Sequence, residues 1–184
     1  MFYVIFLCAV AGLVAADQWT KLWTVANFAA PAAPNLYSTA DAAKPFLPGI
    51  VELTRVHNYG AAWSSFSGQR WLLLGVTSVL LIVIAVLVVK GIVQHPLGLS
   101  ACVLIFSGGI GNLIDRARVG YVVDMFHFEF WPSYPVFNVA DICVVVGTVL
   151  GSIYYLWLYE KYDAPRKAQP KEEPTDGEAD APTE

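Results

Sequence analysis

The sequence predicts a membrane α-helical protein in which four transmembrane helices carry a small β element and an extended interfacial segment on one membrane face. Of the 184 residues, 57% are hydrophobic and only 14% are charged, whereas a soluble domain usually carries about 25% charged residues. Several apolar runs approach the roughly 20 residues that cross the hydrocarbon. The length limits the chain to one folded unit, residues 1–162, and a polar tail, residues 163–184, that we expect to be disordered.

The first apolar run predicts a helix over about residues 2–28. Asp17 and Lys21 are spaced i, i+4 with the acid before the base, the favourable order on a helix, so the helix is expected to continue past them. Trp19 and Trp23 suit the membrane interface. A secretory signal cleaved just before Asp17 is the alternative. It is disfavoured because no Lys or Arg precedes the run, where a signal is basic.

The next region, residues 29–69, contains many Pro and Gly breakers and is too long for a simple connection. Because Ile50–Val56 is rich in β-branched residues, we expect a small β element over about residues 45–70 on the membrane surface. The second spanning helix is predicted over residues 71–89, an uncharged stretch between Arg70 and Lys90.

The third spanning helix is predicted over residues 96–116 and ends in small residues that suit close packing in lipid. One face of its last turns presents Gly108, Asn112 and Arg116.

The segment Tyr121–Phe130 alternates with period 2 and predicts a strand or extended chain, in which Asp124 shares its face with three phenylalanines. The fourth spanning helix is predicted over residues 136–159. Asn138 and Asp141 lie one turn apart on the same side of it.

Four spans place both termini on one side of the membrane and the first and third connections on the other. The unusual polar residues therefore gather at one face, and acidic side chains beside lipid are costly enough to indicate a functional site. The gathered residues are Asp17, Lys21, Asn58, Asp115, Arg116, Asp124 and Asp141. Counting Lys and Arg does not decide which side is cytoplasmic.

Asp124 and Asp141 are the candidate catalytic pair. Two neighbouring carboxylates cannot both ionise cheaply, so one supplies a general acid and the other a general base. The helix dipole favours the charged form of Asp141, and the phenylalanine face favours protonated Asp124. Without the acidic tail the body is nearly neutral, so no nucleic-acid partner is expected. No HExxH, CxxC or phosphate-binding loop occurs, so we expect no metal or cofactor.

Two other classes of function remain possible at this point. A small transporter or channel subunit would use the acids as a proton or cation relay, but a relay would place them near mid-bilayer on several helices rather than at helix ends. A non-enzymatic assembly factor would leave the paired acids unexplained.

Four segments resemble the bacterial lipoprotein signal peptidase (signal peptidase II) family of membrane aspartic peptidases: DQWTK from Asp17, VHNYGAAWS from Val56, GGIGNLIDRARVGYVVD from Gly108 and FNVAD from Phe137. The resemblance implies four transmembrane helices and a periplasm-facing β cradle in the bacterial inner membrane, with cytoplasmic termini. It implies cleavage of diacylglyceryl-modified prolipoproteins on the amino side of the lipidated cysteine. Membrane lipids are the other expected partners, and one chain suffices chemically.

The resemblance also assigns roles to residues. Asp124 and Asp141 become the catalytic dyad, and Asp17 and Lys21 a supporting pair. The residues expected to line the site are Asn58, Gly60, Gly108, Asn112, Arg116, Asn138 and Ala140. Asp115 is expected to support the site, because it points away from its neighbour Arg116 on a helix and needs another partner.

Overall fold

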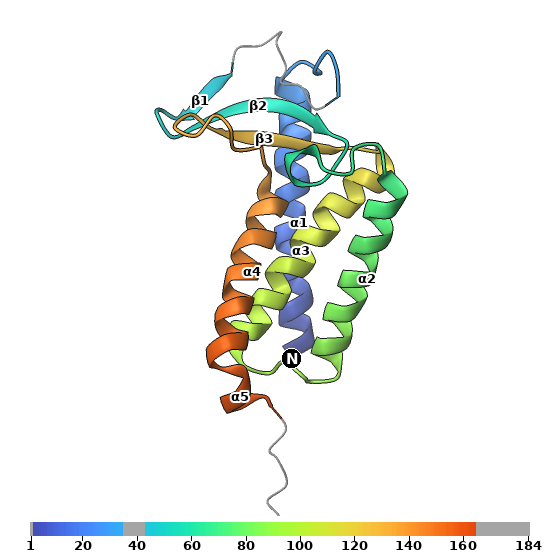
Figure 1. The fold of residues 1–184 in the computed structure, drawn as a ribbon, viewed down its shortest axis with the longest axis vertical. Coiled ribbons are helices and arrows are strands. Elements are labelled where there is room, and N and C mark those ends of the chain that lie inside the picture. The colour runs from blue at the N-terminus through green and yellow to red at the C-terminus, as the bar shows by residue number, and fades with distance from the viewer. Residues whose placement is uncertain (1, 35–42, 165–184) are drawn as a thin grey trace, which may run out of the picture.

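Four long helices form the body of the protein, as the sequence predicts (Figure 1). The computed structural model describes residues 2–34 and 43–164. The helices are α1 (Phe2–Asn27), α2 (Arg70–Val89), α3 (Pro96–Arg118) and α4 (Val139–Trp157), with a short α5 (Tyr159–Tyr162) after them. Each of the four is long and apolar enough to cross a membrane. An α-helix satisfies the hydrogen bonds of its backbone within the segment, as a lipid environment requires.

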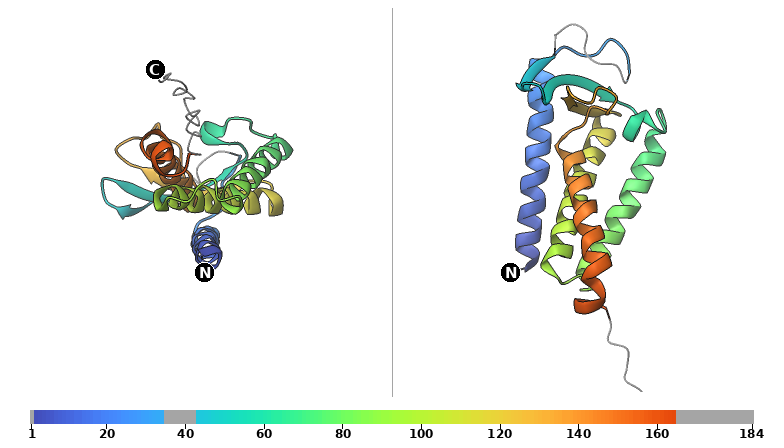
Figure 2. Two further views of the ribbon diagram at one scale, coloured as in Figure 1. Left: turned by 90° about the horizontal axis from the view of Figure 1, so that it is seen from below. Right: turned by 60° about the vertical axis from the view of Figure 1, so that its left-hand side comes forward.

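The helix α3 lies at the centre and contacts α1, α2 and α4 (Figure 2). In the most apolar 18-residue stretch of α3, 39% of the residues are buried inside the protein, against 11% in α2. Most side chains of α2 therefore point outward. Glycines allow α4 to lie close against α3. A Cβ on Gly108 would collide with the carbonyl oxygen of Ala140, and one on Gly147 would lie 3.0 Å from the backbone nitrogen of Ile105.

A three-stranded antiparallel sheet lies across the ends of the helices opposite the N-terminus (Figure 1). Its strands are β1 (Lys44–Leu47), β2 (Val51–Asn58) and β3 (Val122–Phe128), with β2 in the middle. The predicted surface element therefore holds two strands, and the predicted extended segment supplies the third. The register pairs Val56 with Asp124 and Asn58 with Val122, which brings the end of β2 beside the strand that carries Asp124.

The helix α4 begins at Val139 rather than near residue 136. The residues before it are held differently: Phe137 forms a β-bridge with Phe126, and Asn138 has an extended backbone and caps the helix. This bridge turns the chain from the sheet edge directly into the first turn of α4.

The N-terminus and α5 lie at the end of the bundle away from the sheet (Figure 1). After α5, Asp163 accepts hydrogen bonds from the backbone nitrogens of Gln94 and His95, both at 3.0 Å, and from the hydroxyl of Tyr154. The chain is thereby tied to the connection between α2 and α3. From residue 165 onward, the predicted disordered tail lies outside the described residues.

Candidate active site

Asp124 and Asp141 come together at the end of the bundle that the sheet covers. Asp124 is carried by β3 and is 1% exposed, and Asp141 lies in the first turn of α4. Asn138 connects them. Its side-chain Nδ2 donates to Asp124 Oδ1 at 2.6 Å, and its backbone nitrogen donates to Asp141 Oδ2 at 3.1 Å. The two carboxylates, 17 positions apart in sequence, therefore share one hydrogen-bonding residue.

Asn138 holds this place because it is the N-cap of α4. Its Oδ1 accepts from the backbone nitrogen of Asp141 at 2.9 Å, and the Asp141 side chain accepts in return from the Asn138 backbone, forming a capping box. Such a box satisfies helix donors that otherwise lack partners and places a carboxylate at the positive end of the helix dipole. The cap thus holds one oxygen of Asp141 through residues that are close to it in sequence.

Asn112 on α3 fixes the other oxygen of Asp141, donating from Nδ2 to Oδ1 at 2.8 Å. Its own Oδ1 accepts from Lys21 Nζ at 3.0 Å and from Asn138 Nδ2 at 3.1 Å. Because each amide group has a donor on one side and an acceptor on the other, these contacts set the orientation of both asparagines.

Lys21 lies at the centre of a buried ion-pair network with Asp17 and Asp115, the Lys21 brace, next to Asn112. It is 3% exposed, and its ammonium contacts Asp17 Oδ2 at 2.9 Å and Asp115 Oδ2 at 3.1 Å as well as Asn112. Asp17 also accepts a hydrogen bond from the backbone nitrogen of Ala140 at 2.9 Å. The first backbone N–H groups of a helix have no partner within it, so Asp17 on α1 satisfies one of those of α4. The pair on α1 is therefore linked directly to the helix that carries Asp141.

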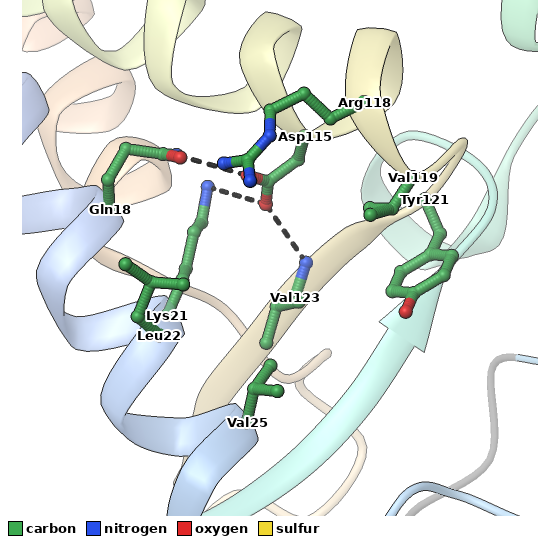
Figure 3. Close-up of a pocket in the computed structure, with 9 residues that line it drawn as sticks. All are labelled: Gln18, Lys21, Leu22, Val25, Asp115, Arg118, Val119, Tyr121 and Val123. Atoms are coloured by element: carbon green, nitrogen blue, oxygen red, sulfur yellow. Dashed lines mark hydrogen bonds and ion pairs between the residues drawn. The ribbon is translucent and has the colours of Figure 1, made fainter.

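Asp115 and Gln18 complete this brace (Figure 3). Asp115 accepts from the backbone nitrogen of Val123 at 3.2 Å, next to Asp124 on β3. The Gln18 side chain donates to Asp115 at 3.0 Å, to Asp17 at 3.1 Å and to the carbonyl of Gly111 at 3.2 Å. Sequence reasoning missed Gln18. The available signal was its place between Asp17 and Lys21, two residues already singled out, but nothing local identifies its partners on α3.

Asn58 and Arg116 approach Asp124 from the other side. Asn58 Nδ2 donates to Asp124 Oδ2 at 3.1 Å, and its Oδ1 accepts from the backbone nitrogen of Gly60 at 2.9 Å. Arg116 donates from Nη2 to the carbonyl of Gly60 at 2.8 Å. A Cβ on Gly60 would lie 2.5 Å from the carbonyl oxygen of Ser65, so the turn after β2 requires glycine. This turn links Asn58 to Arg116 and hence to α3.

The surroundings of Asp124 favour its protonated form. Burial is the largest cause that raises the pKa of Asp124 well above its usual range, and the nearby charge of Asp141 raises it further. The hydrogen bonds from Asn58 and Asn138 oppose this shift. The arrangement can therefore hold one protonated and one charged carboxyl group side by side, which is what acid–base catalysis on a single water needs.

The remaining predicted residues serve the site through the backbone. Gly108 and Ala140 form the close contact between α3 and α4, and Ala140 presents its backbone nitrogen to Asp17.

Two histidines lie in the sheet. His57 stacks on Tyr121 with ring centroids 4.0 Å apart, and His127 contacts Glu52 at 2.7 Å. Within residues 2–34 and 43–164, no three His, Cys, Asp or Glu side chains are grouped so that they could hold a metal ion.

Residues 9–157 match the family model described as signal peptidase (SPase) II. The chain belongs to the signal peptidase II family. It is therefore a peptidase, and a membrane relay of protons or cations is not favoured. Because its four helices are of membrane-spanning length, it is a multi-pass membrane member of that family.

Lipoprotein signal peptidases are among the relatives of this chain. The one from Streptococcus pyogenes serotype M6 is 40% identical over 162 residues, covering 86% of this chain and 96% of the relative. The one from Lactococcus lactis subsp. lactis is 44% identical over 143 residues, covering 77% and 85%. A bacterial membrane enzyme structure obtained by the in meso method at 2.3 Å resolution superposes with a TM-score of 0.70 at 26% identity, covering 91% of this chain and 95% of that one.

Proposed function

We propose that the protein is an aspartic endopeptidase that removes signal peptides from diacylglyceryl-modified prolipoproteins, cleaving on the amino side of the lipidated cysteine. The observation that carries the proposal is the hydrogen-bonded pair of Asp124 and Asp141, joined through Asn138 at 2.6 and 3.1 Å. Membership of the signal peptidase II family and the presence of lipoprotein signal peptidases among its relatives support this substrate class.

In the proposed reaction a water molecule lies between the two carboxyl groups. Asp141 is the charged partner, because it accepts from Asn112 and from the Asn138 backbone at the start of a helix. It takes a proton from the water, whose oxygen attacks the scissile carbonyl. Protonated Asp124 donates its proton to the carbonyl oxygen. Collapse of the tetrahedral intermediate breaks the C–N bond. The proton held by Asp141 goes to the departing amine, and one hydroxyl of the intermediate returns its proton to Asp124 as the new carbonyl forms.

Arg116 and Asn58 are the proposed substrate-binding residues beside the pair. Arg116 donates from Nη2 to the carbonyl of Gly60, which holds the guanidinium where its positive charge interacts with Asp141 and Asp124. Gly108 and Ala140 keep α3 and α4 close enough for Asn112 to reach Asp141.

The site is proposed to face the periplasm, with both termini in the cytoplasm of a bacterium and the helices in its inner membrane. Support comes from the position of the sheet at the end of the bundle opposite the N-terminus (Figure 1), where β3 carries Asp124 and the first turn of α4 carries Asp141. A lipidated substrate lies at the membrane surface, where this end of the helices meets water. Since every residue of the proposed site comes from one chain, a monomer is the proposed active form.

The test is cleavage of a purified lipidated prolipoprotein by purified protein, with mass spectrometry of both products. Asp124→Asn and Asp141→Asn are each expected to lower the cleavage rate about 100-fold or more, since each removes one partner of the acid–base pair. Glu160→Gln is the matched carboxylate-to-amide control, because Glu160 is exposed on α5 away from the sheet. Normal cleavage by either aspartate variant overturns the mechanism, and a product cut elsewhere overturns the proposed position.

A further inference from the structure

The middle strand β2 contains an irregularity just before the position opposite Asp124. Leu53 pairs with Phe126, and Val56 pairs with Asp124. Two residues of β2 therefore lie opposite one residue of β3, which is the arrangement of a β-bulge. Residues 54–56 are all buried, whereas side chains of a regular strand point to alternate faces. The bulge thus buries Arg55, which is 8% exposed.

The buried guanidinium of Arg55 binds the end of α1, which lies beside β2 (Figure 1). Its Nη1 donates to the carbonyl of Phe28 at 2.9 Å and to the carbonyl of Val25 at 3.3 Å. The last carbonyl groups of a helix have no partner within it, and the helix dipole favours a positive charge beside them. Arg55 therefore joins the middle strand of the sheet to the helix that carries Asp17 and Lys21.

The same guanidinium also holds the end of β2 through a second nitrogen. Arg55 Nε donates to His57 Nε2 at 3.0 Å, so neutral His57 carries its proton on Nδ1. The His57 ring stacks on Tyr121 with an interplanar angle of 20°. Tyr121 directly precedes β3, so the end of β2 is held between α1 and the start of β3.

This arrangement controls where Asn58 points. Val56 is directly opposite Asp124, so Asn58, two residues further along β2, lies on the same face as that carboxyl group. A slip of the strand by one residue would turn Asn58 to the other face. We propose that Arg55 is a positioning residue of the peptidase proposed above, on which this inference rests. By joining α1 to the end of β2, it fixes the strand register in which Asn58 donates to Asp124.

The test is a double-mutant cycle measured by prolipoprotein cleavage. Arg55→Met removes the donors and keeps most of the side-chain length. It is expected to lower the rate about tenfold, the size of one hydrogen bond lost from Asp124. In the Asn58→Ala background the same substitution should change the rate less than about twofold, because the contact that Arg55 positions is already gone. A tenfold loss in both backgrounds would overturn the proposal. Normal cleavage by Arg55→Met, beside an inactive Asp124→Asn, would overturn it while leaving the proposed function intact.

The pH–rate profile separates positioning from a general loss of folded protein. The hydrogen bond from Asn58 lowers the pKa of Asp124, so its loss moves the alkaline limb to higher pH. We expect Arg55→Met to move the limb in this direction and the double variant to move it no further than Asn58→Ala. The other charged groups that face Asp124 stay in every variant: Asp141, Lys21 and Arg116. A limb that stays in place in Arg55→Met would contradict the proposal.

Arg55→Lys tests whether charge alone suffices. It keeps the positive charge but has one ammonium in place of the two donor nitrogens Nη1 and Nε, so the limb should still move to higher pH. A normal limb and normal cleavage in Arg55→Lys would assign the effect to charge and overturn the positioning role. If Arg55→Met does not fold, Arg55→Lys takes its place in the cycle.

Lys44→Met is the matched control, because Lys44 is another cation at the end of α1. It donates to the carbonyl of Asn27 at 3.4 Å, but it is exposed and belongs to β1. It should cleave normally. Amide hydrogen exchange gives a readout that needs no cleavage: residues 56–58 should exchange at least about tenfold faster in Arg55→Met than in Lys44→Met. Equal exchange would overturn the proposal whether or not the protein cleaves prolipoproteins.

Discussion

Asn138 donates a 2.6 Å hydrogen bond from its side chain to Asp124 while its backbone and side chain together form the capping box with Asp141. One residue therefore has two separable duties. It stabilises the start of α4, and it fixes the position of Asp124 relative to Asp141.

Replacing Asn138 by Ala should remove both duties. Loss of an N-cap costs about 1 kcal/mol, and leaving Asp124 without one of its two amide donors costs about 1–3 kcal/mol more. Asn138→Ser keeps an oxygen that can cap the helix but lacks the amide donor. We expect thermal unfolding to show recovery of stability in Asn138→Ser, while cleavage stays at least about tenfold below normal. Full recovery of cleavage by the serine variant would show that only the cap matters.

The pH dependence of cleavage should report the raised pKa of Asp124. If Asp124 acts in its protonated form, the rate falls as pH rises through this pKa. The hydrogen bond from Asn58 lowers the pKa, so Asn58→Ala should raise it and move the alkaline limb of the profile to higher pH. His57→Gln changes the adjacent residue without removing the hydrogen bond from Asn58 to Asp124 and should leave the limb in place. An unchanged limb in Asn58→Ala, or one moved to lower pH, contradicts the assignment.

His57 should make the folded protein less stable in acid. Burial is the main cause that lowers its pKa from 6.5 to about 4, and the charge of Arg55 contributes. Between these values the unfolded chain binds the proton more readily, so the free energy of unfolding falls as pH is lowered through this window. Thermal midpoints measured across the window should fall more for the unsubstituted protein than for His57→Gln. Equal slopes for the two proteins would argue that His57 titrates normally.

Any side chain added at Gly108 should disrupt its contact with Ala140. A Cβ on Gly108 would collide with the Ala140 carbonyl oxygen, so Gly108→Ala must push α4 away from α3. Overpacking of this kind costs about 1–3 kcal/mol, and it should weaken cleavage by moving Asn112 from Asp141. Gly75→Ala on α2 is the control, since its added Cβ would have no atom within 4 Å apart from the neighbouring backbone of its own helix. Similar thermal midpoints for the two variants would contradict this account.

Removing the Lys21 charge should be the most damaging change in the brace. Lys21→Gln leaves the carboxylates of Asp17 and Asp115 buried without their cation, which costs about 3–5 kcal/mol. Adding Asp17→Asn to this variant removes one of the two uncompensated charges and should restore part of the stability. Denaturation of the two single variants and the double variant measures the coupling, and strictly additive losses would show that the ion pair contributes little.

Much of the fold could be predicted because the signals are local. Residues 71–89 contain no charge, and an uncharged apolar run of this length has few alternatives to a spanning helix. Asp17 and Lys21 were recognised by their helical spacing, and the alternation around Asp124 indicated an extended chain. The placement of the connections predicts that these residues lie at the same membrane face. In the structure Asn112 links Lys21 to Asp141, and Asn138 links Asp141 to Asp124.

Other parts of the site could not be predicted from local pattern. Besides Asp17, Gln18 has two partners on α3, more than 90 positions away, and no periodicity in the sequence identifies them. The pairing of β3 with β2, which places Asn58 beside Asp124, depends on a register between two segments separated by two spanning helices. The spacing places Asn138 on the same side of the helix as Asp141, and the family resemblance predicts that it lines the site. Neither predicts that it caps α4 and donates a hydrogen bond to Asp124, as the structure shows.

The sequence by itself determined which segments cross the membrane and which acidic residues lie at helix ends, because the cost of placing polar groups in lipid acts on each segment separately. Only the tertiary structure decided which groups share hydrogen bonds. Those contacts depend on how closely α3 and α4 pack and on the register of the sheet, and both are set by side chains that are distant in sequence and meet only in the folded chain.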